Sequence, residues 1–194
     1  MKLGNPFIFA GSCRHLMCEK FVSPQGPFYQ STQILDLLPI PCDTYGDFAS
    51  SFFKSGGRTF NKAVFDALYA RYDGITWYLQ AILNKIWEYG EALQDVRQVL
   101  KAEADLYEER ALVYRDLYVA QNAASKLVLR AIAKRGVVAE PNSADFLSLP
   151  GLPGASTERA ALKDLDGKDI IYRSEAGWIV YDRLFGEWLR TSQI

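Results

Sequence analysis

The fold of this chain is decided by residues 156–189, which read STERAALKDLDGKDIIYRSEAGWIVYDRLFGEWL. From Thr157 to Leu165 the apolar residues recur at helical spacing, which predicts a short helix with one inward face. Ser156 stands where an N-cap is expected, and Gly167 follows the last turn. The stretch therefore begins with a helix whose two ends are both marked in the sequence.

The remainder of this stretch predicts a β-hairpin and a closing helix. Ile170 to Arg173 and Trp178 to Tyr181 are rich in β-branched and aromatic residues, as strands are. They are joined by Ser174-Glu175-Ala176-Gly177, which is typical of a tight hairpin connection. Asp182 is placed to cap a final helix that runs through Leu189.

Two more helices are predicted further upstream, so the pattern extends to a complete domain. One runs from Ala123 to Lys134, and Asn142-Ser143 can cap a short one from Ala144 to Leu149, before a turn at 150–154. The order helix, helix, turn, helix, hairpin, helix is that of a winged helix. Because every junction carries its own cap or turn residue, we predict a winged-helix domain over residues 118–194.

The middle of the chain, residues 39–117, predicts a small helical bundle with short connections. Its apolar periodicity indicates four helices: Thr44–Phe53 after an Asp43 cap, Asn61–Arg71, Trp77–Tyr89, and about Leu93–Asp116. Together with the winged helix, this predicts a mainly α chain with some β structure.

Residues 1–38 differ in character from the rest. Pro6-Phe7-Ile8-Phe9-Ala10-Gly11-Ser12 reads as a buried strand of the kind found in the middle of a parallel sheet. A lone buried strand cannot satisfy its own backbone. We therefore expect it to pair with the extended run Gln33 to Leu38, or with a second copy of the chain across an exposed edge, which would give a homodimer.

The composition argues against several classes of protein. With 22 Lys and Arg against 23 Asp and Glu, the net charge of −1 gives no general attraction to nucleic acid. No apolar run approaches membrane-spanning length and no export signal is evident, so we expect no membrane partner. The three cysteines all lie within the first 42 residues and make no disulfide framework, which is consistent with a reducing cytoplasm.

The residue types that bind zinc occur together only near the N-terminus, at Cys13, His15, Cys18 and Cys42. Structural zinc needs four such ligands in tetrahedral geometry, and this spacing is not that of a usual zinc knuckle. Ordinary buried thiols are the preferred interpretation, and we predict no metal site.

These pieces, in this order, resemble the C-terminal part of an archaeal-type AAA+ ATPase over essentially all 194 residues. In that family a sensor strand ends in Gly-Ser, as Phe7 to Ser12 does. A Ser-Pro loop and a Leu-Pro turn follow, matched by Ser23-Pro24 and Leu37-Leu38-Pro39. The helical lid contains a Gly-x-Pro or Gly-x-Thr turn before an aromatic-rich helix, matched by Gly74-Ile75-Thr76-Trp77-Tyr78, and a winged helix ends the family's chain.

The resemblance implies a remnant of an α/β ATPase core at 1–38, a helical lid at 39–117, and four nucleotide-sensing residues, Ser12, Arg14, Gly74 and Thr76. Each of these residues also has a structural interpretation. Ser12 can cap the helix that follows it, with Arg14 on its solvated first turn. Thr76 can cap the next helix, with Trp77 and Tyr78 in the bundle core.

The parts that bind and hydrolyse nucleotide in that family are absent from this sequence. It contains no Gly-x-x-x-x-Gly-Lys-Ser/Thr and no apolar run ending in Asp-Asp or Asp-Glu. Where the family often has Pro-Leu-Tyr-Gly-Arg, this chain reads Pro27-Phe28-Tyr29-Gln30-Ser31, with serine in place of arginine. ATP and Mg²⁺ therefore belong to the full-length family. For this chain alone we predict no catalytic residue, no cofactor and no ATPase activity.

The predicted recognition helix and hairpin supply the candidate contact residues Ser156, Arg159, Lys163 and Arg173. From residue 122 to the end, ten Lys and Arg stand against nine Asp and Glu, and Glu175 makes the hairpin tip acidic. This balance is a weak electrostatic basis for DNA binding, so contact with a protein is at least as well supported.

Two hypotheses follow from these observations. In the first, the chain is a non-catalytic C-terminal module of an archaeal-type AAA+ ATPase, whose partner is the missing ATPase half or another protein. In the second, it is a stand-alone winged-helix DNA-binding regulator with the helical region as its dimerisation or sensing domain. A metal-dependent function through the cysteine cluster is a third and weaker hypothesis.

Overall fold

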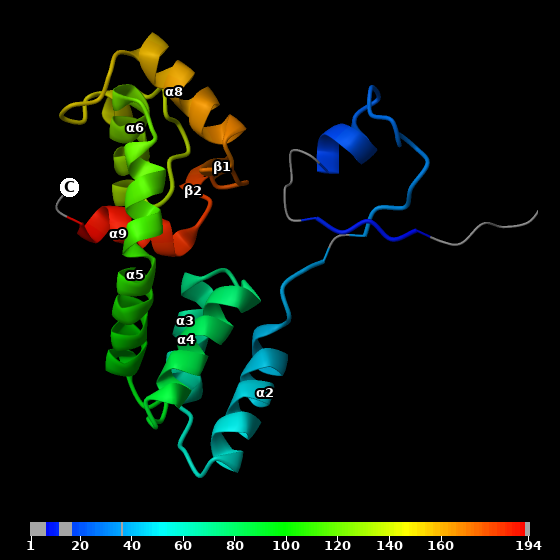
Figure 1. Ribbon diagram of the computed structural model, residues 1–194, viewed down its shortest axis with the longest axis vertical. Coiled ribbons are helices and arrows are strands. Elements are labelled where there is room, and N and C mark those ends of the chain that lie inside the picture. Colours follow the sequence, from blue (N-terminus) through cyan, green and yellow to red (C-terminus); the bar gives the residue numbers. More distant parts are fainter. Residues whose placement is uncertain (1–6, 12–16, 36, 193–194) are drawn as a thin grey trace, which may run out of the picture. The chain divides into compact units, whose positions relative to one another are not determined.

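The computed structural model describes residues 7–11, 17–35 and 37–192 (Figure 1). The chain forms two compact units, which divide between Leu38 and Pro39. The described residues are mainly helical with one small sheet, as predicted. Within these ranges, no helix combines the length and the apolar character needed to cross a membrane.

The second unit holds nearly all of the regular structure. Its elements are α2 (Cys42–Ser55), α3 (Lys62–Arg71), α4 (Thr76–Glu88), α5 (Val96–Val119), α6 (Ala123–Arg135), α7 (Ala144–Leu147), α8 (Ala155–Gly167), β1 (Ile171–Arg173), β2 (Trp178–Val180) and α9 (Arg183–Thr191). The expected order of helices and hairpin is therefore confirmed.

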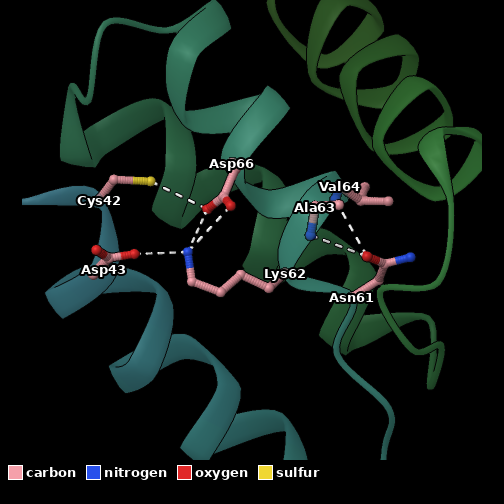
Figure 2. A network of polar contacts seen from close by, with 7 residues as sticks. All are labelled: Cys42, Asp43, Asn61, Lys62, Ala63, Val64 and Asp66. Carbon is pink, nitrogen blue, oxygen red and sulfur yellow. Dashed lines mark hydrogen bonds and ion pairs between the residues drawn. The ribbon is translucent and has the colours of Figure 1, made fainter.

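Local capping explains where several of these helices begin. The Asn61 side chain accepts hydrogen bonds from the backbone N–H groups of Ala63 (3.0 Å) and Val64 (3.4 Å) at the start of α3 (Figure 2). Asp95 caps α5 in a capping box with Gln98, and Asp182 caps α9.

The predicted Asp43 cap of α2 is wrong. The helix begins two residues earlier than predicted, at Cys42 instead of Thr44, with Pro41 in the N-cap position. The Asp43 carboxylate instead pairs with the Lys62 ammonium at 2.8 Å, and Lys62 also pairs with Asp66 at 2.8 Å (Figure 2). Asp43 therefore links α2 to α3 instead of closing the end of its own helix.

The bundle core is formed mainly by aromatic and branched side chains of α2 to α5. Phe65, Leu79, Ile82 and Ile86 are completely buried. Trp77 was expected in this core, but 44% of it is exposed, and its ring lies under the Arg110 guanidinium at 4.5 Å. Trp77 therefore lies on the outer side of the first turn of α4, where the Arg110 guanidinium covers its ring.

The winged-helix half is built on α6, which packs against both α8 and α9. The hairpin pairs Ile171 with Val180, Tyr172 with Ile179 and Arg173 with Trp178. α5 reaches from the bundle to α9 (Figure 1), and the predicted boundary at 117/118 falls inside this helix. The two halves of the second unit are therefore joined by a continuous helix and by packing.

The predicted cap of α8 is also wrong. The helix begins at Ala155, with Gly154 in the N-cap position, and the Gly154 carbonyl accepts the N–H of Glu158 at 3.0 Å. Ser156 is therefore an exposed residue of the first turn. Glycine readily adopts the non-helical geometry that an N-cap needs, which moves the start two residues toward the N-terminus.

The described residues of the first unit do not form the predicted sensor strand. Phe7 to Gly11 makes no strand pairing, and neither do the described residues of the run 33–38, so the expected pairing of the two runs is wrong. Without a neighbouring ladder the apolar side chains stay outside, and Ile8 is 94% exposed. Phe9 instead contacts the rings of Phe21 and Phe28, with centroids 5.3 and 5.8 Å away.

One irregular helix lies beside this aromatic cluster. It is the π-helical turn η1 (Cys18–Val22), which carries Phe21. The candidate nucleotide-sensing residues Ser12 and Arg14 lie outside the described residues. The homodimer expected from an exposed strand edge stays a prediction.

Candidate interaction site beside helix α8

The hairpin register places two side chains at the margin of the winged-helix core. Residues directly opposite each other in an antiparallel pair share a face. Ile171 and Val180 are such a pair, and both are buried. Side chains two residues apart in a strand point to the same face, so the pair Arg173 and Trp178 lies on the same face as Ile171 and Val180. Arg173 is exposed.

A segment that precedes α7 forms the next wall. Val138 bridges Trp178, donating its N–H to the Trp178 carbonyl at 3.0 Å and accepting from the Trp178 N–H at 2.9 Å. A Cβ on Gly177 would come within 2.5 Å of the Val138 carbonyl oxygen, so this approach needs glycine. The Ser143 hydroxyl caps α7 by accepting from Phe146 N–H at 3.2 Å. Both ends of the segment 139–142 are therefore held in place.

The third wall is α8, whose two faces differ sharply. Ala161, Leu162 and Leu165 are buried against the core, whereas Arg159 and Lys163 are exposed. The spacing of four residues puts these two cations on neighbouring turns of one face.

These three walls border a cavity of about 650 Å³ that is open to solvent. Its lining includes three cations, two carboxylates, two small polar residues and an apolar wall: Arg159, Lys163 and Arg173; Glu140 and Asp166; Asn142 and Ser143; Pro141, Leu162 and Trp178. Within residues 7–11, 17–35 and 37–192, none of the three cations forms an ion pair or a hydrogen bond through its side chain. The cavity therefore offers unpaired positive charge next to apolar surface.

The structure brings together three of the four predicted contact residues. Arg159, Lys163 and Arg173 all line the cavity, whereas Ser156 does not. Sequence reasoning missed Pro141 and Trp178, and it considered Asn142 only as a helix cap. No local signal could have found them, because the Val138–Trp178 bridge that brings them to α8 joins residues 40 positions apart in the sequence.

A buried acidic residue lies on the same helix. Glu158 is completely buried, and neither carboxylate oxygen has a hydrogen-bond partner among the residues that the structure describes. Burial raises its pKa above the ordinary value, and the neighbouring Arg159 charge opposes that rise. A buried carboxyl without a partner costs stability.

Replacing Glu158 with methionine, which has a similar volume, should raise the free energy of unfolding at pH 7 by about 1–3 kcal/mol. Because folding raises the pKa of Glu158, the unfolded state loses this proton at a lower pH than the folded state, and the wild-type stability falls as pH rises above about 4.5. The free energy of unfolding of Glu158→Met should decrease less between pH 4 and 8 than that of the wild type. Urea unfolding across this pH range measures the difference, with Glu108→Met, at an exposed position, as the control. A loss of stability in Glu158→Met would mean that the carboxylate has a stabilising role.

The lid turn before α4 is shaped by Gly74, one of the residues assigned by resemblance. Its φ of +68° is in the left-handed region, and a Cβ there would come within 2.4 Å of the Tyr69 hydroxyl. That hydroxyl donates to the Ile40 carbonyl at 2.7 Å. Thr76 is not the cap: Ile75 holds the N-cap position, and Thr76 is the exposed first residue of α4. Gly74 is thus required for the turn itself.

The lid turn is connected directly to the start of α9. Asp73, beside Gly74, forms an ion pair with Arg183. The Tyr78 hydroxyl accepts from the Arg183 backbone N–H at 3.0 Å and lies 3.3 Å from Asp182 Oδ1. These contacts link the bundle to the last helix of the winged-helix domain.

The cysteine cluster gains no support as a metal site from the described residues. Cys42 donates its thiol to Asp66 Oδ1 at 3.2 Å (Figure 2). Burial and this hydrogen bond raise the pKa of the thiol, which disfavours the thiolate that zinc needs. Cys13 and His15 lie outside the described residues, which contain no group of three or more metal-binding side chains placed to hold an ion.

Comparison with known proteins supports the winged-helix interpretation. Residues 112–191 match a family model described as a probable winged helix domain. The solved structure of the Walker-type ATPase PABY2304 of Pyrococcus abyssi is similar, with a TM-score of 0.55 and 19% identity over 89% of this chain and 48% of that one. No curated protein matches the sequence. The C-terminal part of this chain is therefore a winged-helix domain, and the chain shares its fold with a part of a Walker-type ATPase about half that protein's length.

Proposed function

We propose that this chain is the lid and winged-helix module of an archaeal-type AAA+ ATPase, and that it works as an interaction or regulatory module without catalysis of its own. The observation that carries the proposal is the fold shared with about half of a Walker-type ATPase, in a sequence that contains no P-loop. In such a protein the cytoplasmic ATPase half would bind ATP and Mg²⁺.

The residues present do not make a nucleotide site by themselves. Phosphate binding in P-loop ATPases depends on a glycine-rich loop with its lysine, and this sequence has neither. Gly74 and Thr76 lie at the start of α4, and in a complete ATPase they would face a nucleotide held by the other half together with Ser12 and Arg14. In this chain alone, Gly74 shapes the turn before α4.

The proposal predicts that the purified chain releases no phosphate from Mg-ATP above the buffer rate. Phosphate release and fluorescent-nucleotide titration measure this, with a P-loop ATPase as the positive control. Clear turnover by the purified chain would contradict the proposal. An in-frame P-loop encoded upstream of Met1 would support it directly.

DNA binding is a second candidate function, favoured by the exposed and unpaired cations Arg159, Lys163 and Arg173. If they neutralise phosphates, gel-shift affinity should fall steeply with salt, with a logarithmic slope of about −0.9 per phosphate contact. The absence of any shift at low salt would remove this candidate.

A further inference from the structure

We infer that the cavity beside α8 binds an acidic segment of a partner protein, with a carboxylate of that segment placed among Arg159, Lys163 and Arg173. The inference rests on the proposed function, since it names the partner of the interaction module. It follows from the charge, the lining and the construction of this cavity.

The charge of the cavity favours an anion, because three cations and two carboxylates line it. Three cations from two elements, α8 and β1, reach the same cavity, and none of them is neutralised by an ion pair among the described residues. Arginine is suited to bind a carboxylate through two parallel hydrogen bonds. Arg159 and Lys163 come from α8 and Arg173 comes from β1, so a carboxylate bound in the cavity has cations on two different elements to pair with.

The apolar part of the cavity lining favours the binding of a peptide over that of a small free anion. Pro141, Leu162 and Trp178 line the same cavity, so a side chain next to the bound carboxylate has apolar surface to contact. Tryptophan and arginine are enriched among the residues that dominate binding energy at protein interfaces. A volume of about 650 Å³ is large enough for two or three side chains of such a segment.

The same cavity is unfavourable for a nucleic-acid backbone. Glu140 and Asp166 belong to its lining, and the tip of the neighbouring hairpin carries Glu175. A run of phosphates laid across this surface would meet these carboxylates, and repulsion between like charges suppresses wrong partners. A single acidic side chain carries one negative charge and therefore meets less of this repulsion than a run of phosphates.

The cavity is also built in advance of binding. The segment 139–142 is tied to β2 by both Val138–Trp178 backbone hydrogen bonds and to α7 by the Ser143 cap. A binding surface that is already ordered loses little conformational entropy when a flexible segment docks.

Selection from a random library of peptides about twelve residues long, with the purified full chain as bait, tests the inference. The enriched peptides should carry Asp or Glu beside an apolar residue. Their affinity should fall at least about tenfold in Lys163→Glu and be unchanged in Arg115→Glu. Arg115 is the matched control, because it is exposed near the C-terminal end of α5 and has no ion pair among the described residues. Circular dichroism checks that both variants are folded.

Three outcomes would overturn the inference: no enriched peptide, enrichment without acidic residues, or equal losses in the two variants. Binding of a DNA duplex that Lys163→Glu abolishes, with no peptide enriched, would assign the cavity to nucleic acid instead. Phosphate release from ATP contradicts only the proposed ATPase module, so the two proposals fail in separate experiments.

Discussion

Replacing Glu103 with alanine is expected to lower the free energy of unfolding by about 2–4 kcal/mol. Glu103 lies on α5 and is only 1% exposed. Its Oε1 accepts a hydrogen bond from the buried Tyr72 hydroxyl at 2.8 Å, and its Oε2 lies 3.3 Å from the Arg71 guanidinium. Alanine would leave the tyrosine hydroxyl without this acceptor and open a cavity between α3 and α5.

The loss of stability in Glu103→Ala is limited because Arg71, the cation paired with Glu103, is partly exposed to solvent. The Arg71 side chain is 37% exposed and also lies 3.5 Å from Glu187, so it keeps water and a second carboxylate after the substitution. Most of the loss should therefore come from the buried Tyr72 hydroxyl and the cavity. Glu103→Gln keeps an acceptor for Tyr72 and should lose less than half as much.

Urea unfolding of Glu103→Ala and Glu109→Ala provides the matched comparison. Both residues lie on α5, but Glu109 is 54% exposed and pairs with Lys85 at the surface. Removing a surface ion pair should cost at most about 1 kcal/mol. Equal losses in the two variants would contradict the view that the buried Glu103 contacts hold the bundle together.

Replacing Asp182 with alanine is expected to destabilise the second unit by about 2–4 kcal/mol. Asp182 Oδ1 accepts from Leu184 N–H at 2.9 Å and from Phe185 N–H at 3.3 Å, which caps α9. The same carboxylate lies 3.3 Å from the hydroxyls of Tyr78 on α4 and Tyr114 on α5. The substitution removes a helix cap and the shared acceptor of two largely buried tyrosines together.

The matched control is Asp145→Ala, which also removes an aspartate near a helix start. Asp145 is 74% exposed and pairs only with Arg135 among the described residues, so its loss should cost less than about 1 kcal/mol. Thermal unfolding monitored by circular dichroism measures both variants. A loss in Asp182→Ala no larger than that in Asp145→Ala would show that the link between bundle and winged helix does not depend on this carboxylate.

Local sequence signals predicted the order of the elements and several of their boundaries. The hairpin turn after Arg173 and the Asp182 cap were both predicted from residues a few positions apart. Three expected caps, Asp43, Thr76 and Ser156, were wrong, because the helices begin earlier, with Pro41, Ile75 and Gly154 in the N-cap positions.

The strand predicted at Phe7 to Ser12 shows where a local pattern is not sufficient to predict structure. Its apolar pattern is typical of a strand, but a strand forms only when another one supplies hydrogen bonds, and the described residues of the first unit supply none. The pattern therefore indicated what these residues can do in a larger sheet, which is different from what they do here.

The sequence by itself determined that this chain is mainly helical and ends in a winged helix, because helix periodicity, caps and hairpin turns act over a few residues. Only the tertiary structure decided which cations share a cavity and which carboxylates are buried. The Val138–Trp178 bridge, the Asp73–Arg183 ion pair and the Glu103–Tyr72 hydrogen bond each join residues far apart in the chain. Such contacts depend on the packing of whole elements, which no local pattern encodes.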